Sequence, residues 1–82
     1  MKHRENTVVV YRDPRPLLAQ KIRMCREAQG LSLRRLSGMI GVDRTVLNDI
    51  ELGRGNPRIT TLAKIASGLE VPLSELLIED ER

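Results

Sequence analysis

The stretch LSLRRLSGMIGVDRTVLNDIELG, residues 31–53, decides the fold, because it carries two helix-start signals about eleven residues apart. Ser32 and Asp43 are residue types whose side chains accept a hydrogen bond from a free amide in the first turn of a helix. An apolar residue precedes each of them and another follows four positions later, which is the spacing of a hydrophobic staple. Gly41 lies between the two signals and can end the first helix. The pattern predicts two short helices joined by a tight turn.

We expect these helices to span about 33–40 and 44–52, and to send the second helix into the major groove of DNA. Leu47 and Ile50 should face the core, which leaves the opposite face of the second helix for bases. Arginine pairs with guanine, asparagine with adenine and aspartate with cytosine, while valine or threonine methyl groups contact thymine. The residues predicted to contact bases are Arg44, Thr45, Val46, Asn48 and Asp49.

Apolar residues at helical spacing continue on both sides of this stretch and predict three further helices. One should run over 16–29, one over about 59–68, and a last short helix should begin near Pro72. Their expected core residues are Leu18, Ile22 and Cys25, then Ile59, Leu62, Ile65 and Ala66, and finally Val71, Leu73, Leu76 and Leu77. The fold class is therefore all-α, with a helix-turn-helix domain over residues 16–78.

Residues 1–15 form an N-terminal arm in which the segment 7–11, TVVVY, favours extended structure such as a short β-strand. A lone strand leaves its backbone groups unpaired, so antiparallel pairing with the same segment of a second subunit would supply a homodimer. The residues expected at that interface are Val8, Val9, Val10 and Tyr11. Two alternatives stay open for the arm: it could pack on its own domain, or it could be disordered with Lys2 and Arg4 reaching DNA. The apolar residues of the last helix could also form the dimer surface in place of the arm.

Charge is divided unevenly along the chain. Residues 1–58 contain 12 Lys and Arg against 6 Asp and Glu, whereas residues 59–82 contain 2 against 5 and end in an acidic tail over 79–82. A basic region of this kind indicates a surface for a polyanion. No segment approaches the roughly 18 apolar residues that cross a bilayer, and no secretory signal precedes the domain. We therefore expect a cytoplasmic protein with no membrane partner.

Catalytic chemistry is not indicated by the residue inventory. The chain has one histidine, His3, and one cysteine, Cys25, which are too few for a metal site or for a paired nucleophile and base. Cys25 falls on the apolar side of its helix, where a structural thiol is expected. We expect a protein that is not an enzyme and that holds no cofactor or metal.

Taken together, these motifs resemble the Cro/phage-repressor (Xre) helix-turn-helix family over residues 17–77. The similarity is carried by Ile-Gly-Val at 40–42, by Ile-Glu at 50–51 with Gly53, by Asn-Pro at 56–57, and by the run LAKIASGLEVPLSELL that ends at Leu77. The resemblance implies a five-helix, lambda-repressor-like DNA-binding domain that binds operator DNA, usually as a two-fold dimer.

The resemblance also suggests roles for residues outside the base-contacting face. The residues it assigns to DNA phosphates are Arg54, Asn56 and Arg58, with Arg23 and Arg35 as additional candidates. It gives Glu51 a structural role, pairing with an arginine or with turn amides. This sequence departs from the family at Leu33, where glutamine usually braces a phosphate, at Gly38 inside a helix, and at Glu70, where glycine is usual.

The function predicted from the sequence is a sequence-specific transcriptional regulator, in the first place a repressor. It would bind a pseudo-palindromic site in double-stranded DNA as a homodimer, with half-sites roughly 10 bp apart. The alternative is an antitoxin-like module that neutralises a toxin or another protein partner and regulates its own operon, with residues 7–11 as the docking strand.

Overall fold

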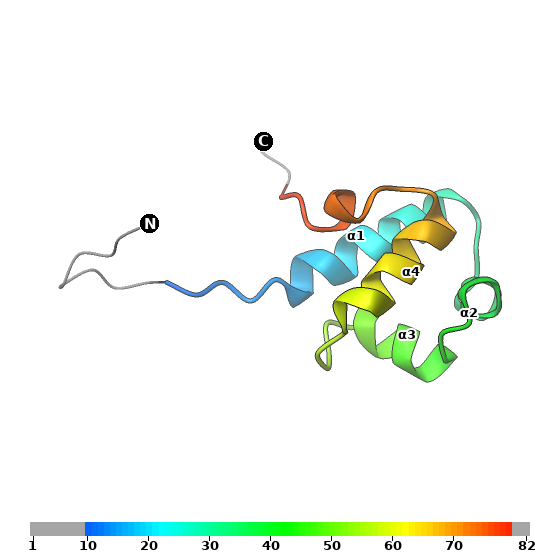
Figure 1. The fold of residues 1–82 in the computed structure, drawn as a ribbon, viewed down its shortest axis with the longest axis horizontal. Coiled ribbons are helices and arrows are strands. Elements are labelled where there is room, and N and C mark those ends of the chain that lie inside the picture. The colour runs from blue at the N-terminus through cyan, green and yellow to red at the C-terminus, as the bar shows by residue number, and fades with distance from the viewer. Residues whose placement is uncertain (1–9, 80–82) are drawn as a thin grey trace.

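The computed structural model describes residues 10–79, which form four α-helices and one 3-10 helix (Figure 1). These are α1 (Arg15–Ala28), α2 (Leu33–Ile40), α3 (Arg44–Glu51), α4 (Ile59–Leu69) and the 3-10 helix η1 (Leu73–Leu76). No β-strand occurs within residues 10–79, so the all-α class is confirmed for this part of the chain. None of its helices is long and apolar enough to cross a membrane.

Local capping explains where α2 and α3 begin and end. Ser32 Oγ accepts a hydrogen bond from the backbone N–H of Arg35 at 3.0 Å, and Asp43 Oδ1 accepts one from the N–H of Thr45 at 2.7 Å. Between the two helices Gly41 adopts φ 68°, the left-handed conformation that glycine reaches without steric cost. These contacts lie within a few residues of each other, which is why the sequence alone could predict both helix starts.

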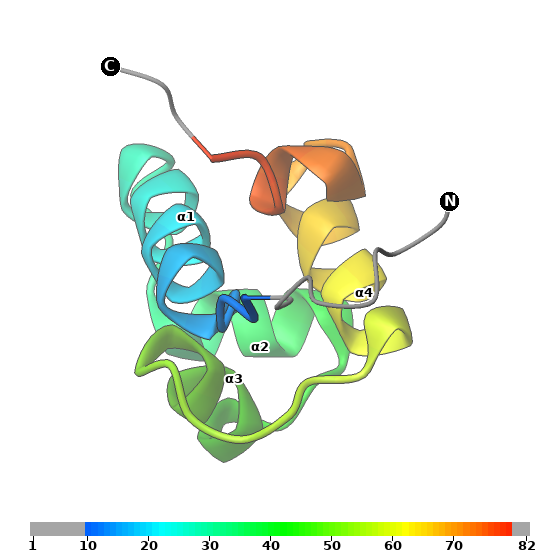
Figure 2. The same ribbon diagram turned by 90° about the vertical axis from the view of Figure 1, so that its left-hand side faces the viewer.

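The core forms where all five elements meet. In Figure 2, α1 and α4 stand on opposite sides, α3 crosses below them and α2 closes the back. The buried residues of this cluster are Leu18, Ile22, Leu36, Val42, Leu47, Ile50, Leu62, Ile65, Ala66, Leu69 and Leu76. Leu36 contributes from α2 and Leu47 and Ile50 from α3, so the same core holds both helices of the turn motif in a fixed relative orientation.

Two details of the predicted helices are wrong. The expected fifth α-helix is instead the four-residue 3-10 helix η1, in which Leu76 is buried and Leu73 is half-buried against the core. So short an apolar segment does not offset the cost of nucleating an α-helix. Ile59 is also 60% exposed at the first position of α4 instead of packing inward, and Leu77 is 46% exposed. The apolar periodicity therefore predicted too large a core at the start of α4 and at the end of η1.

The arm is described only from Val10 onward. Val10 and Tyr11 are non-helical and highly exposed, at 78% and 79% of their surface, and they form no strand within the described residues. Val8 and Val9 lie outside the described residues. Pairing of this segment with a second subunit therefore stays a prediction.

Candidate nucleic-acid interface

Helix α3 presents two chemically different faces. Leu47 and Ile50 bury their side chains in the core, with 0% and 4% of their surface exposed. Four of the predicted base-contacting residues are exposed, and the fifth, Asp49, is half-buried. The exposed four are Arg44, Thr45, Val46 and Asn48. The outward face of α3 therefore carries cationic, hydroxyl, apolar and amide groups within two helical turns.

A shallow, open hollow of about 560 Å³ lies beside the turn between α2 and α3, and we call it the Arg34 hollow. It is lined by Arg34, Ser37, Asp43, Arg44 and Thr45. The Ser37 hydroxyl donates to the carbonyl oxygen of Val42 at 2.5 Å and so ties α2 to the turn. A second hollow, of about 230 Å³, is lined by Leu33, Arg44, Thr45 and Asn48. Arg44 and Thr45 thus lie where both hollows meet, at the start of α3.

Arg34 lines the candidate interface, although the sequence reasoning did not single it out. The sequence had suggested its neighbour Arg35 for a phosphate contact, but Arg35 lines a different groove, together with Lys64 of α4. The only signal in the sequence is spacing, since Arg34 lies three positions before Ser37, on the same flank of α2. Spacing does not say which flank faces α3, so only the packing of the helices distinguishes the two arginines.

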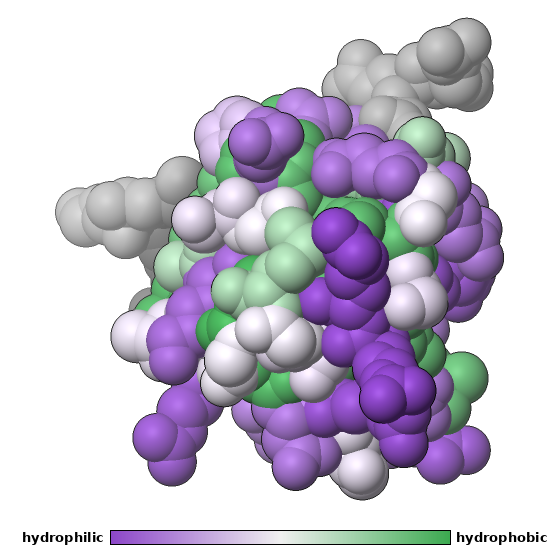
Figure 3. All heavy atoms as spheres, turned by 90° about the vertical axis from the view of Figure 1, so that its right-hand side faces the viewer, coloured by the Kyte–Doolittle hydropathy of each residue, from purple (hydrophilic) through white to green (hydrophobic). Residues whose placement is uncertain are grey.

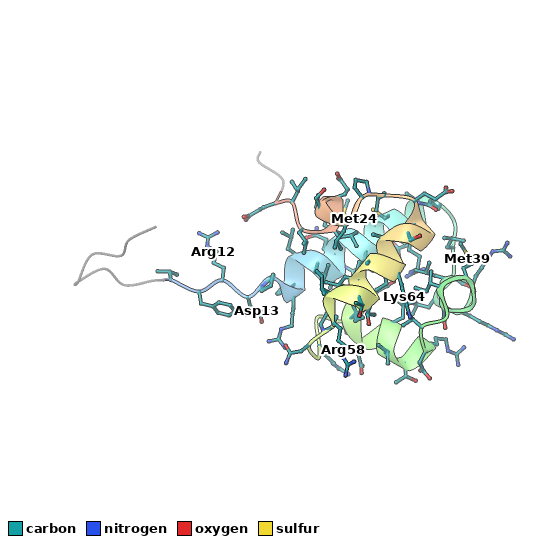
Figure 4. The ribbon with its side chains drawn as sticks, in the orientation of Figure 1. Arg12, Asp13, Met24, Met39, Arg58 and Lys64 are labelled. Atoms are coloured by element: carbon teal, nitrogen blue, oxygen red, sulfur yellow. The ribbon has the colours of Figure 1, made fainter. Side chains whose placement is uncertain are left out.

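The loop between α3 and α4 carries three further predicted contacts. Arg54, Asn56 and Arg58 are all exposed. The loop runs along the lower edge of the molecule beside α3 in Figure 2, and Figure 4 shows Arg58 near that edge. These three side chains therefore continue the polar and cationic surface of α3 onto the neighbouring loop.

This loop is held by the first residue of α1, Arg15. The Arg15 Nη1 donates to the carbonyl oxygen of Gly55 at 2.9 Å, and Arg15 also pairs with Asp13 at 2.7 Å. The hydrogen bond from Arg15 lowers the pKa of Asp13, and the same bond raises the pKa of Arg15. One arginine thus connects the end of the arm to the backbone of the α3–α4 loop.

The C-terminal end of α3 is anchored by a buried ion pair between Arg26 and Glu51. The distances are 2.6 Å from Arg26 Nε to Glu51 Oε2 and 2.9 Å from Nη2 to Oε1, while Arg26 Nη1 donates to Leu31 O at 2.6 Å. The hydrogen bond to Glu51 raises the pKa of Arg26. Arg23, also suggested for phosphate, donates from Nη1 to the backbone oxygen of Glu51 at 3.2 Å. The structural role predicted for Glu51 is confirmed.

A helix-turn-helix family model, HTH_3, matches residues 22–76, which include the whole of this surface except the arm. The chain belongs to the HTH_3 family. This membership agrees with the resemblance to the Cro/phage-repressor proteins, and the matched residues include α2, the turn and α3.

Relatives of this HTH_3 chain carry regulatory names. It is 38% identical over 60 residues to the HTH-type transcriptional regulator SutR of Escherichia coli K12, covering 73% of the chain and 34% of SutR. It is 37% identical over 57 residues to the control protein C.MunI of a Mycoplasma species, covering 70% of the chain and 77% of C.MunI. The crystal structure of the restriction-modification controller protein C.AhdI from Aeromonas hydrophila superposes with a TM-score of 0.72 at 31% identity, covering 74% and 92%.

Several of these relatives are longer proteins. The chain spans 34% to 62% of the length of SutR and five further curated relatives. The similarity therefore covers only part of each of those regulators.

Proposed function

We propose that this protein is a sequence-specific DNA-binding regulator of transcription whose α3 enters the major groove. The observation that carries the proposal is the position of Arg44 and Thr45, which are exposed at the start of α3 and line both hollows while the opposite face of α3 is buried. Base contacts from Arg44, Thr45, Val46, Asn48 and Asp49 would provide specificity. Asp49 is half-buried, so its contact would be restricted to a group that approaches the helix closely.

Phosphate contacts would fix the protein on the duplex on either side of α3. In the proposal Arg34 binds a phosphate from the α2 side, and Arg54, Asn56 and Arg58 bind phosphates from the α3–α4 loop. Arg34 takes the role first suggested for Arg35, because it shares a hollow with Arg44 whereas Arg35 does not. Arg23 is also left out of the proposed phosphate contacts, because its Nη1 donates to the backbone oxygen of Glu51.

Repression by a homodimer is the mode of action that we propose. The support is indirect: relatives are named control or controller proteins, and a pseudo-palindromic operator would match a two-fold dimer with half-sites roughly 10 bp apart. The exposed Val10 and Tyr11 are apolar surface that a second subunit could cover. The same exposed residues would serve an antitoxin-like protein that docks a toxin, which is the alternative function.

The test is binding of the purified protein to its own upstream DNA and to duplex of random sequence, across a range of salt concentrations. Arg44→Ala should reduce the preference for the specific site by about 5- to 150-fold, since one bidentate base contact is worth about 1–3 kcal/mol. Lys64→Ala is the matched control, because it removes one exposed positive charge on α4 away from α3. Equal affinity for both DNAs, unchanged by Arg44→Ala, would refute the function.

Arg34 and Arg35 provide a second comparison within the same assay. Arg34→Ala should weaken binding to every sequence by a similar factor and reduce the slope of log affinity against log salt by about 1, as expected for one lost phosphate contact. Arg35→Ala should leave that slope unchanged. The reverse pattern would mean that the other flank of α2 faces the DNA backbone.

A further inference from the structure

A groove of about 540 Å³ lies between α2 and the C-terminal half of α4, at the end of the molecule opposite to the arm. Its lining includes Leu31, Arg35, Met39, Ile40, Lys64 and Gly68. We call it the Arg35 groove. In Figure 3 this end of the molecule faces the viewer, and residues of intermediate hydropathy form a pale area bordered by strongly hydrophilic side chains.

The Arg35 groove and the Arg34 hollow lie on opposite flanks of α2. Arg34 and Ser37, three residues apart, line the hollow beside α3, whereas Arg35 and Met39, four residues apart, line the groove beside α4. No residue lines both. DNA bound to α3 and the Arg34 hollow would therefore leave the Arg35 groove accessible. Only this accessibility in the DNA complex rests on the proposed function.

The groove combines an apolar base with two cations. Met39 is 53% exposed although its side chain is large and apolar, and the neighbouring Ile40 is half-buried against the core. Arg35 and Lys64 contribute positive charge from α2 and α4 respectively, and within residues 10–79 neither forms an ion pair. Exposed methionine is typical of surfaces that adapt to a protein partner, and unpaired cations on both sides of it favour a partner with carboxylates.

We propose that the Arg35 groove binds an acidic segment of a different protein. An apolar side chain of that segment would pack on Met39 and Ile40, and carboxylates on either side of it would pair with Arg35 and Lys64. Glu70 also lines the groove, at the C-terminal end of α4. Its negative charge would repel a carboxylate there and so limits the acidic stretch to the part between the two cations.

Charge complementarity selects this partner over a second copy of the chain. In a two-fold pairing of the groove with itself, each copy would bring two cations and one carboxylate, Glu70, so two surfaces of net positive charge would meet. Like charges brought together in this way disfavour association. An acidic partner removes that repulsion and neutralises both cations.

Methyl NMR tests the proposal directly, because Met24 on α1 is 54% exposed and serves as a control in the same sample (Figure 4). The protein is labelled with ¹³C at the methionine methyl groups and titrated with a helical peptide of about twelve residues that carries leucines along one face and glutamates elsewhere. The Met39 methyl resonance should shift while that of Met24 stays in place. A peptide with lysine in place of every glutamate should cause no shift.

Charge reversal gives the second arm of the experiment. The double variant Arg35→Glu with Lys64→Glu should bind the acidic peptide at least tenfold more weakly, and its circular dichroism should match that of the wild type because both side chains are exposed. An unchanged affinity in a folded double variant would overturn the proposal. If the double variant does not fold, Arg35→Gln and Lys64→Gln are tested separately. Each single variant should lose less affinity for the acidic peptide than the double variant.

Three results of the titration would overturn the proposal. The first is no response of the Met39 resonance up to about 1 mM peptide, a concentration that half-fills even a weak site. The second is an equal shift of the Met24 and Met39 resonances. The third is a shift of the Met39 resonance when duplex DNA is added without peptide. The last result would assign the groove to phosphates. The peptide titration contains no DNA, so its outcome is independent of whether the protein binds an operator.

Discussion

Replacing Gly68 by alanine tests how closely α4 packs against α2. A Cβ at position 68 would lie 2.3 Å from Ile40 Cγ2 and 3.2 Å from Leu36 Cδ1, where ordinary carbon contacts begin near 3.4 Å. Ile40 is β-branched and helical, so its methyl group cannot turn away without leaving its preferred rotamer. Either the side chain or the helix must move, and overpacking of this kind costs about 1–3 kcal/mol.

Gly38 provides a matched control because it lies inside α2 with nothing within 4 Å of its Cβ position. Both substitutions replace a helical glycine by alanine and gain the same helix propensity, about 1 kcal/mol. That gain cancels when the two variants are compared. Gly38→Ala should therefore stabilise the protein by about 1 kcal/mol, and the free energies of unfolding of the two variants should differ by about 1–3 kcal/mol.

The measurement is urea unfolding of the wild type and both variants, followed by circular dichroism at 222 nm. A melting curve would show the same difference as roughly 4–8 °C for each kcal/mol in a domain of this size. If Gly68→Ala stabilised the protein as much as Gly38→Ala does, the two helices would not be in the close contact described here. The position of α2, and with it the Arg34 hollow, would then need revision.

Two further substitutions, the first with a control variant, test the anchoring of α3 and the end of α4. Glu51→Gln should destabilise the fold by about 3 kcal/mol, because it leaves the arginine of α1 charged, largely buried and without its carboxylate. The control Glu27→Gln removes the exposed carboxylate 4.0 Å from the same arginine and should change the free energy of unfolding by less than about 0.5 kcal/mol. If urea unfolding showed the same loss of stability in Glu51→Gln and Glu27→Gln, the buried pair would have no special role. Glu70→Gly should stabilise the protein by about 0.5–1 kcal/mol, because Glu70 has φ 60° and glycine relieves that strain at some cost in chain entropy. A melting temperature lowered by Glu70→Gly would contradict this reasoning.

The helix starts were predictable because the interactions that set them are local. Ser32 and Asp43 each bind an amide two or three residues away, and Gly41 needs only its own freedom to adopt a positive φ. The inward direction of Leu47 and Ile50 follows from helical periodicity, which also defines the outward face proposed to contact bases. Information of this kind is complete within a window of about ten residues, so the sequence alone determined it.

Other features depend on segments that are distant in the chain, and only the tertiary structure decided them. Arg34 and Arg35 are equivalent in the sequence, and the packing of α2 between α3 and α4 assigns one to the hollow beside α3 and the other to the groove beside α4. The sequence suggested an arginine partner for Glu51 but could not choose Arg26, which lies 25 residues away. Periodicity likewise could not show that, in the last apolar run, Leu76 is buried while Leu77 stays exposed and that the run forms a 3-10 helix. In each case the outcome depends on which surfaces of the protein pack together, and the sequence pattern does not specify which distant segments meet.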